Sequence, residues 1–161
     1  MDMKKVLAAA MLACAMLSYG CGNDSKTAPK AEQKQAQETK KPADDLSAAK
    51  DGTYTAESRA DEWGKGRLTI VVKDHKITAA EFLGVKPDGK IKDETYGTSD
   101  GEIKNEGKYK KAQNALKAHE KYAAQLVERQ KVSDVDAIAG ATVSYNQFVE
   151  AAQNAIEQSK K

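Results

Sequence analysis

The residue of this chain with the clearest chemical potential is a threonine near the C-terminus, Thr142. It follows two small residues, Gly140 and Ala141, which leave room for a bulky group to approach the backbone. A helix is expected just beyond it, and the start of a helix favours a bound anion such as a phosphate group. The Thr142 hydroxyl is therefore a candidate for esterification by a phosphate. The same residues also fit an ordinary turn before a helix, in which Thr142 caps locally and Gly140 provides flexibility.

Other residues that commonly do chemistry show no comparable arrangement. An isolated threonine hydroxyl is a poor nucleophile, and no neighbour of Thr142 is an obvious base that would activate it. His75 is expected in a turn and His119 on a helix among charged residues, both exposed, without function and without metal-ligand spacing. We see no Ser-His-Asp set, no phosphate-binding glycine loop and no carboxylate pair with an evident pocket. The chain is therefore not expected to be an enzyme in its own right, and no metal site is predicted.

The first half of residues 51–161 is expected to form a small antiparallel sheet. Apolar residues alternate with other types from Leu68 to Val72, which predicts a half-buried strand. Asp74 and His75 then form a two-residue turn into a second strand over residues 77–83. Residues 53–56 are a further short strand. The polar, glycine-bearing segment 88–107 is expected to be a long loop, and such loops in small domains are often functional.

The second half is expected to form two helices. Apolar residues recur at helical spacing from Tyr109 to Leu126, so a helix should run through Gln130. A second helix is expected from about Asn146, and the spacing of Ser144 and Gln147 predicts a capping box just past Thr142. Strands followed by helices favour an α+β fold, with a small twisted, mainly antiparallel sheet packed against two C-terminal helices.

The N-terminal residues have the layout of a secretory signal. Lys4 and Lys5 precede an apolar run over residues 6–17, which is too short to span a bilayer comfortably. Gly20 precedes Cys21, so residues 1–21 resemble a bacterial lipoprotein signal, with serine at the first lipobox position where leucine is usual. A lipidated Cys21 would place the protein outside the cytoplasm and anchor it to the cell membrane. The alternatives are a lipobox at Cys14, with a stunted apolar region, or an ordinary signal-peptidase site.

Residues 22–50 are expected to be a disordered polar tether, because they contain one leucine and no aromatic or β-branched aliphatic residue. Both cysteines lie at or before position 21, so the remainder has no disulfide, thiolate metal site or iron–sulfur cluster. The formal net charge of +2 is mixed along the chain, which argues against nucleic acid as a partner.

The stretch Asp136-Ala-Ile-Ala-Gly-Ala-Thr142 resembles the flavinylation signature of the FMN-binding domain family, Asp-x-x-(Ser/Thr)-Gly-Ala-Thr. Ala139 departs from it, since the family usually has serine or threonine there. Segments 51–55, 67–77 and 87–97 resemble other parts of the family, so the resemblance covers nearly all of residues 51–161. The relatives it suggests are spirochaete membrane-immunogen lipoproteins and the covalent flavin subunit of sodium-pumping NADH–quinone reductase.

This resemblance implies FMN as cofactor, joined through a phosphoester to Thr142 by a separate flavin transferase. Asp136, Gly140 and Ala141 belong to the implied attachment signature. Glu94 and Gly97 fall where the family places a loop near the flavin.

Three aromatic residues in expected loops are candidates for stacking on the flavin ring. These are Trp63, Tyr96 and Tyr145, of which Tyr145 is favoured because it lies three residues from Thr142. The alternative is that each packs at the edge of a small core, as lone aromatic residues usually do.

Two functions follow from different readings of the same chain. The first is an extracytoplasmic electron carrier with covalent FMN, exchanging electrons with a donor and an acceptor that the sequence does not identify. The second is a lipid-anchored ligand-binding or surface interaction module, or antigen, without covalent flavin. The departure at Ala139 keeps the second reading open.

Overall fold

The computed structural model describes residues 44–161, which form a three-stranded antiparallel sheet and two long helices. The strands are β1 (Gly52–Glu57), β2 (Lys65–Lys73) and β3 (Lys76–Val85), in the order β1-β2-β3. The helices are α1 (Glu106–Arg129) and α2 (Thr142–Ser159), with the short 3-10 helix η1 (Val132–Asp134) between them. The predicted α+β fold is confirmed. The predicted signal segment 1–21, the lipidation of Cys21 and most of the tether lie outside the described residues.

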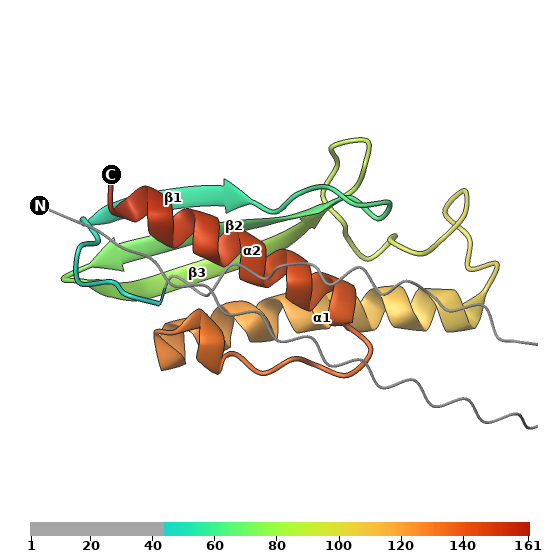
Figure 1. Cartoon of the computed structure of the whole chain (residues 1–161). Coiled ribbons are helices and arrows are strands. Elements are labelled where there is room, and N and C mark those ends of the chain that lie inside the picture. The colour runs from blue at the N-terminus through green and yellow to red at the C-terminus, as the bar shows by residue number, and fades with distance from the viewer. Residues whose placement is uncertain (1–43) are drawn as a thin grey trace, which may run out of the picture. The chain divides into compact units, whose positions relative to one another are not determined.

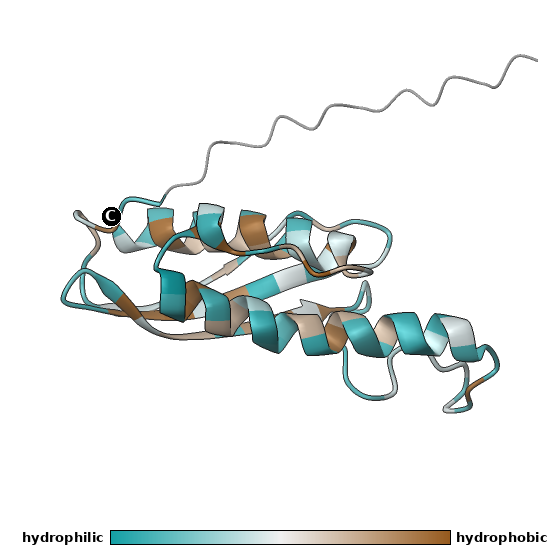
Figure 2. Cartoon of the chain, turned by 90° about the horizontal axis from the view of Figure 1, so that it is seen from below, coloured by the Kyte–Doolittle hydropathy of each residue, from teal (hydrophilic) through white to brown (hydrophobic). Residues whose placement is uncertain are grey.

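Both long helices cover one face of the sheet (Figure 1). Helix α1 packs mainly on β3, and α2 packs on β1 and β2. The alternation predicted for β2 is confirmed, since Leu68, Ile70 and Val72 are at most 1% exposed. Their side chains meet an aromatic cluster from the helices, in which the rings of Tyr122 and Phe148 stack at 5.4 Å. The helix faces turned away from the sheet are largely hydrophilic (Figure 2).

The turn between β2 and β3 is also as predicted. Asp74 and His75 have φ angles of 52° and 60°, and Lys73 pairs with Lys76. Two consecutive residues of positive φ are the signature of a type I′ turn, whose twist matches that of the strands it joins.

The start of α2 differs from the prediction. The helix begins at Thr142 rather than near Asn146, and the side chain of Ala141 at the N-cap position accepts no hydrogen bond. The predicted capping box is wrong because Ser144 and Gln147 are buried in the first turns and bond to other elements. Ser144 and Gln147 thus form hydrogen bonds with His119 and Asp61, which are distant in the sequence, instead of capping the helix locally.

Residues 44–50, which we call the strap, belong to the folded part although the sequence assigned them to the tether. Leu46 and Ala49 are buried in the core, at 8% and 2% exposure. The backbone N–H of Lys50 donates to Ser159 O over 2.8 Å, and Asp44 Oδ1 accepts from the N–H of Val132 over 2.7 Å. Two apolar side chains and these hydrogen bonds order a segment whose composition alone is polar.

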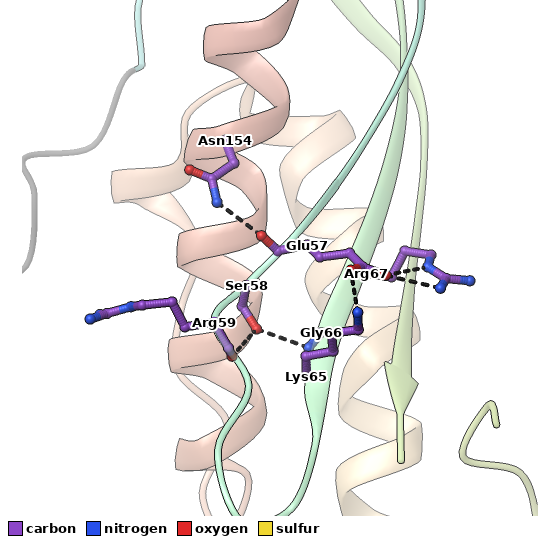
Figure 3. A network of polar contacts seen from close by, with 7 residues as sticks. All are labelled: Glu57, Ser58, Arg59, Lys65, Gly66, Arg67 and Asn154. Carbon is purple, nitrogen blue, oxygen red and sulfur yellow. Dashed lines mark hydrogen bonds and ion pairs between the residues drawn. The ribbon is translucent and has the colours of Figure 1, made fainter. Parts of the chain in front are cut away.

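A polar network closes the edge of the sheet against α2 (Figure 3). Glu57 pairs with Lys65 and, over 2.9 Å, with Arg67, and its backbone carbonyl accepts from Asn154 Nδ2 over 2.9 Å. The hydrogen bond from Lys65 is the main cause that lowers the pKa of Glu57. Because these groups are partly exposed, the network contributes alignment of β1, β2 and α2 more than stability. Within residues 44–161, no helix is both long and apolar enough to cross a membrane.

Candidate functional site

A cavity of about 560 Å³ opens between α1, the first turn of α2 and the loop that follows β3. Its size falls within the range of about 300–1,000 Å³ common for small-molecule sites. Helix α1 supplies one wall, made of Lys108, Lys111, Ala112, Ala115, Leu116 and His119. The N-terminal half of α1, which carries most of these residues, extends past the ends of the strands (Figure 1).

Apolar side chains dominate the mouth of the cavity. Trp63 and Val143 line it and are each 45% exposed, and Leu116 faces it from α1. Exposed apolar residues that share the lining of one cavity, unlike apolar residues scattered singly, are typical of ligand-binding surfaces. The mouth therefore suits a flat, largely apolar ring.

Trp63 is held at the tip of a tight turn by contacts from α2. Asp61 accepts from the Trp63 backbone N–H over 2.7 Å and from Gln147 Nε2 over 2.9 Å. Gln147 also donates to Gly64 O over 3.2 Å. Gly64 has a φ of 105°, and an added Cβ would lie 1.9 Å from Val85 O, so only glycine fits. The turn predicted around Trp63 is confirmed, and α2 holds the backbone of the turn that carries it.

A second set of cavity residues is polar and buried, and we call Lys92, His119 and Ser144 the cavity floor. Their exposed fractions are 8%, 5% and 6%. His119 Nε2 and Ser144 Oγ share a hydrogen bond of 3.1 Å, and the His119 ring packs edge-on against Phe82 at 4.8 Å. Burial, with a smaller contribution from Lys92, lowers the pKa of His119 to about 4. His119 is thus neutral at pH 7, and the prediction of an exposed histidine is wrong.

Lys92 is the charged member of the floor. Burial lowers the pKa of its ammonium, while Asp61 opposes that shift. Its Nζ lies 4.9 Å from the centroid of the Tyr96 ring. The backbone N–H of Lys92 donates to Gly84 O over 2.8 Å, after a tight turn at Gly89. Sequence reasoning missed Lys92, because a lysine after a polar turn carries no local sign of burial.

The loop expected near a flavin does line the cavity. Tyr96 and Gly97 are cavity residues, and Gly97 has a φ of 96°. Glu94 is exposed outside the lining, but its backbone carbonyl accepts from Tyr109 Oη over 3.2 Å and from Gln113 Nε2 over 3.0 Å. Glu94 therefore positions the loop on α1 through its backbone, and its carboxylate faces solvent.

The signature loop, residues 136–142, runs up to the cavity without lining it. Thr142 is exposed on the first turn of α2, next to Val143 and Ser144, which are cavity residues. The Thr142 hydroxyl makes no hydrogen bond with any residue of the described part of the chain. Gly140, with a φ of 79°, borders open space where a side chain would be. Ala141 is buried as the N-cap residue.

Two residues of the predicted site point elsewhere. Asp136 forms an ion pair with Arg129 at 2.8 Å and lies outside the cavity lining. Tyr145 donates to Val135 O over 3.1 Å and packs against Tyr122. These contacts with Tyr122 and with the C-cap residue of η1 turn the Tyr145 ring toward the core and away from the cavity lining. Trp63 and Tyr96 are the aromatic candidates that the fold brings to the cavity.

Comparison with known proteins identifies what this arrangement is similar to. The FMN-binding domain family matches residues 62–157, which include β2, β3, α1, the cavity and the signature loop. The crystal structure of the CPE2226 protein from Clostridium perfringens is 30% identical, covering 70% of this chain and 89% of that chain, with a TM-score of 0.55. A solution NMR structure of a protein from Clostridium thermocellum is 29% identical over 70% of this chain and 93% of that chain, with a TM-score of 0.43. No curated protein matches the chain significantly.

The residues present fit FMN. The cavity has the volume and the apolar mouth that an isoalloxazine ring needs, with Trp63 and Tyr96 available for stacking. Lys92 supplies a positive charge inside it. The first turn of α2 lies beside it with no side-chain cap, which leaves backbone N–H groups for a phosphate.

Proposed function

Because this chain belongs to the FMN-binding domain family and has FMN as its cofactor, we propose that it is a membrane-anchored extracytoplasmic electron carrier whose FMN is esterified to Thr142. When bound, FMN supplies one- and two-electron redox chemistry. The observation that carries the proposal is the position of Thr142, exposed and with a free hydroxyl among the described residues, beside the cavity.

The surroundings of Thr142 support attachment of the phosphate there. Thr142 is the first residue of α2, so the phosphate would lie at the positive end of the helix dipole. The ring could then extend past Val143, which lines the cavity mouth. Thr142 and Val143 are both exposed already, so attachment of the phosphate and entry of the ring would not require a buried side chain to move.

Formation of the ester needs a separate flavin transferase. No residue described in the structure is hydrogen-bonded to the Thr142 hydroxyl as a base. The loop leading to it is open to another protein, since Gly140 borders empty space and the Asp136 side chain is 74% exposed. Asp136 is then a recognition residue for the transferase, while its ion pair with Arg129 holds the loop in place.

The carrier role rests on the openness of the cavity mouth. Trp63 and Val143 are exposed at its edge, so a donor or acceptor could approach the ring closely. The described residues contribute position, a buried charge and stacking surfaces to the cofactor rather than a second substrate site. We therefore propose that the protein carries electrons between partners and is not an enzyme in its own right.

Anchoring is proposed from the sequence. Lipidation of Cys21 after removal of the signal would fix the protein to the outer face of a membrane. A covalent flavin suits that location, because a dissociated cofactor would be lost from the cell. In a cell that processes lipoproteins, Cys21→Ala should move the protein from the membrane fraction to the soluble fraction. Unchanged membrane fractionation of that variant would contradict the anchor.

The central experiment tests the phosphoester. The chain is co-expressed with a flavin transferase, denatured and separated by gel electrophoresis, and flavin fluorescence is recorded on the polypeptide band. Fluorescence is expected in the wild type and in Thr78→Val, a matched change at another exposed threonine, and is expected to vanish in Thr142→Val. A wild-type band without flavin contradicts covalent attachment. Flavin that copurifies with the native wild type but leaves it on denaturation favours the alternative, a non-covalent FMN-binding module.

A further inference from the structure

The cavity floor contains a buried cation without an ionic partner. Lys92 is 8% exposed, yet no residue of the described chain forms an ion pair or side-chain hydrogen bond with its Nζ. Every fully inaccessible side-chain nitrogen or oxygen in residues 44–161 has a partner. The unpartnered Nζ must therefore retain some contact with solvent, and Lys92 lines the cavity. Burying an ammonium group without a counter-charge is costly, so a ligand in the cavity is the natural source of compensation.

The fold makes specific room for this lysine. An added Cβ at Gly84 would lie 2.7 Å from Lys92 Cδ and 2.8 Å from His119 Cε1. The absence of a side chain at Gly84 thus lets the Lys92 stem and the His119 ring pack side by side between β3 and α1. Tyr96 covers the ammonium on the other side at 4.9 Å.

The neighbouring groups leave Lys92 as the dominant charge of the floor. His119, whose pKa is about 4, carries no charge at neutral pH, and Ser144 is neutral. Asp61 influences Lys92 electrostatically but forms no ion pair with it, since its carboxylate bonds to Trp63 N–H and to Gln147. A charge in such a partly dry site acts more strongly than the same charge at the surface.

We propose that the Lys92 ammonium complements the negative charge that the flavin ring gains on reduction, and that it thereby raises the reduction potential of the bound FMN. Reduction by two electrons and one proton leaves the ring with one negative charge, while the electrons come from an external reductant and the proton from water. Lys92 forms and breaks no covalent bond and keeps its own protons. A positive charge near the ring is a recognised means by which a protein tunes a flavin. The inference rests on FMN lying in the cavity and not on the phosphoester to Thr142.

The test is the reduction potential of FMN bound to the full chain, titrated with dithionite against redox dyes. Lys92→Met keeps an unbranched side chain, one atom shorter, and removes its charge. We expect it to lower the ratio of reduced to oxidised FMN at a given potential by about tenfold or more, which is about 30 mV or more for a two-electron couple. Lys117→Met, an exposed lysine on α1 outside the cavity lining, should change this ratio less than about threefold because solvent screens it. Equal potentials for the wild type and Lys92→Met would overturn the proposal.

A charge-preserving variant separates charge from packing. Lys92→Arg should keep the ratio within about threefold of the wild type, because the guanidinium remains protonated. A tenfold fall in the ratio of reduced to oxidised FMN in Lys92→Arg would overturn the proposal. If Lys92→Met does not fold, Lys92→Gln replaces it as the uncharged variant, and the same criterion holds. If the role of Lys92 were purely structural, the reduction potential of bound FMN would not depend on whether the side chain at position 92 is charged.

Riboflavin, which lacks the phosphate, distinguishes the ring from the phosphate as the group that Lys92 binds. Lys92→Met should weaken binding of reduced riboflavin and reduced FMN to the apo-protein by the same factor. Weakening confined to FMN would place Lys92 on the phosphate and overturn the proposal. These measurements use non-covalent binding, so they stand even if no flavin is ever found esterified to Thr142.

Discussion

The signature loop and the cavity floor meet within the first turn of α2, yet their environments are opposite. Thr142 is exposed with a free hydroxyl, whereas Ser144, two residues later, is 6% exposed and bonded to His119. A residue that another enzyme must modify has to be reachable. A residue that tunes a bound ring gains strength from the exclusion of water. The first turn of α2 therefore contributes an exposed residue to the signature loop and a buried residue to the cavity floor, because successive side chains point to different sides of the helix.

The largest expected difference between these regions is in stability. Phe148 is fully buried on α2 and packs against Phe82 and Tyr122, so Phe148→Ala should lower the free energy of unfolding by about 3–5 kcal/mol. Thr142→Val should change it by less than about 0.5 kcal/mol, because the side chain is exposed. Urea denaturation followed by circular dichroism measures both. Comparable losses in the two variants would mean that the signature loop is a structural element after all.

The next effect is the pH dependence that the cavity floor should impose. The pKa of His119 falls from 6.5 to about 4 on folding, chiefly because of burial. Between these values the unfolded chain binds more protons than the folded one, so His119 makes stability fall as pH decreases from 6.5 to 4. The loss should level off below pH 4 at no more than about 3 kcal/mol.

His119→Gln provides the comparison for this pH effect, because it keeps a polar side chain that cannot titrate in this range. The difference in unfolding free energy between the wild type and the variant should shrink by most of that amount from pH 7 to pH 4. Parallel curves for the two proteins would show that His119 titrates normally and that the floor is wetter than its burial indicates.

The smallest effect concerns the turn that carries Trp63. Gln147→Ala removes the hydrogen bonds to Asp61 and Gly64, at a cost of about 1–2 kcal/mol. Trp63 is the sole tryptophan of the chain, so its fluorescence reports on this turn directly. Acrylamide should quench it more strongly in Gln147→Ala than in the wild type.

Asn154→Ala is the matched control, since it removes another amide bond from α2 to the sheet, at Glu57 O. Because Asn154 is exposed, its removal should lower stability by less than Gln147→Ala does, and it should leave quenching unchanged. If both variants alter quenching alike, α2 acts on the turn through general loosening rather than through Gln147.

The elements that could be predicted from the sequence are those set by local rules. The strand at Leu68–Val72 and the turn at Asp74 and His75 follow from alternation and turn chemistry, and both are confirmed. The signature loop is recognisable in the sequence because its residues are contiguous. Cavity residues such as Trp63 and Tyr96 are identifiable only as aromatic residues in loops, since nothing in the sequence indicates that they converge.

The cavity floor escaped prediction because each member depends on a distant partner. His119 has charged sequence neighbours, which suggest an exposed position. Its side chain instead lies on the face of α1 that contacts Ser144 and Phe82. Ser144 fits a local capping rule, yet its hydroxyl bonds to His119 instead. Burial of Lys92 depends on the absence of a side chain at Gly84 in β3. No sequence pattern within one strand or loop predicts a contact between two such segments.

Under the proposed lipid anchor at Cys21, the strap would have a mechanical consequence. It joins the fold where Lys50 bonds to Ser159, at the last residue of α2, while Thr142 is the first. The 18 residues of α2 separate the two points by roughly 27 Å at 1.5 Å per residue. Tension applied through the chain before residue 44 would first load the hydrogen bond between Asp44 and Val132, and then Leu46, Ala49 and the end of α2. The cavity, lined by Val143 and Ser144 in the first turn of α2, therefore lies near the opposite end of α2 from the bond between Lys50 and Ser159.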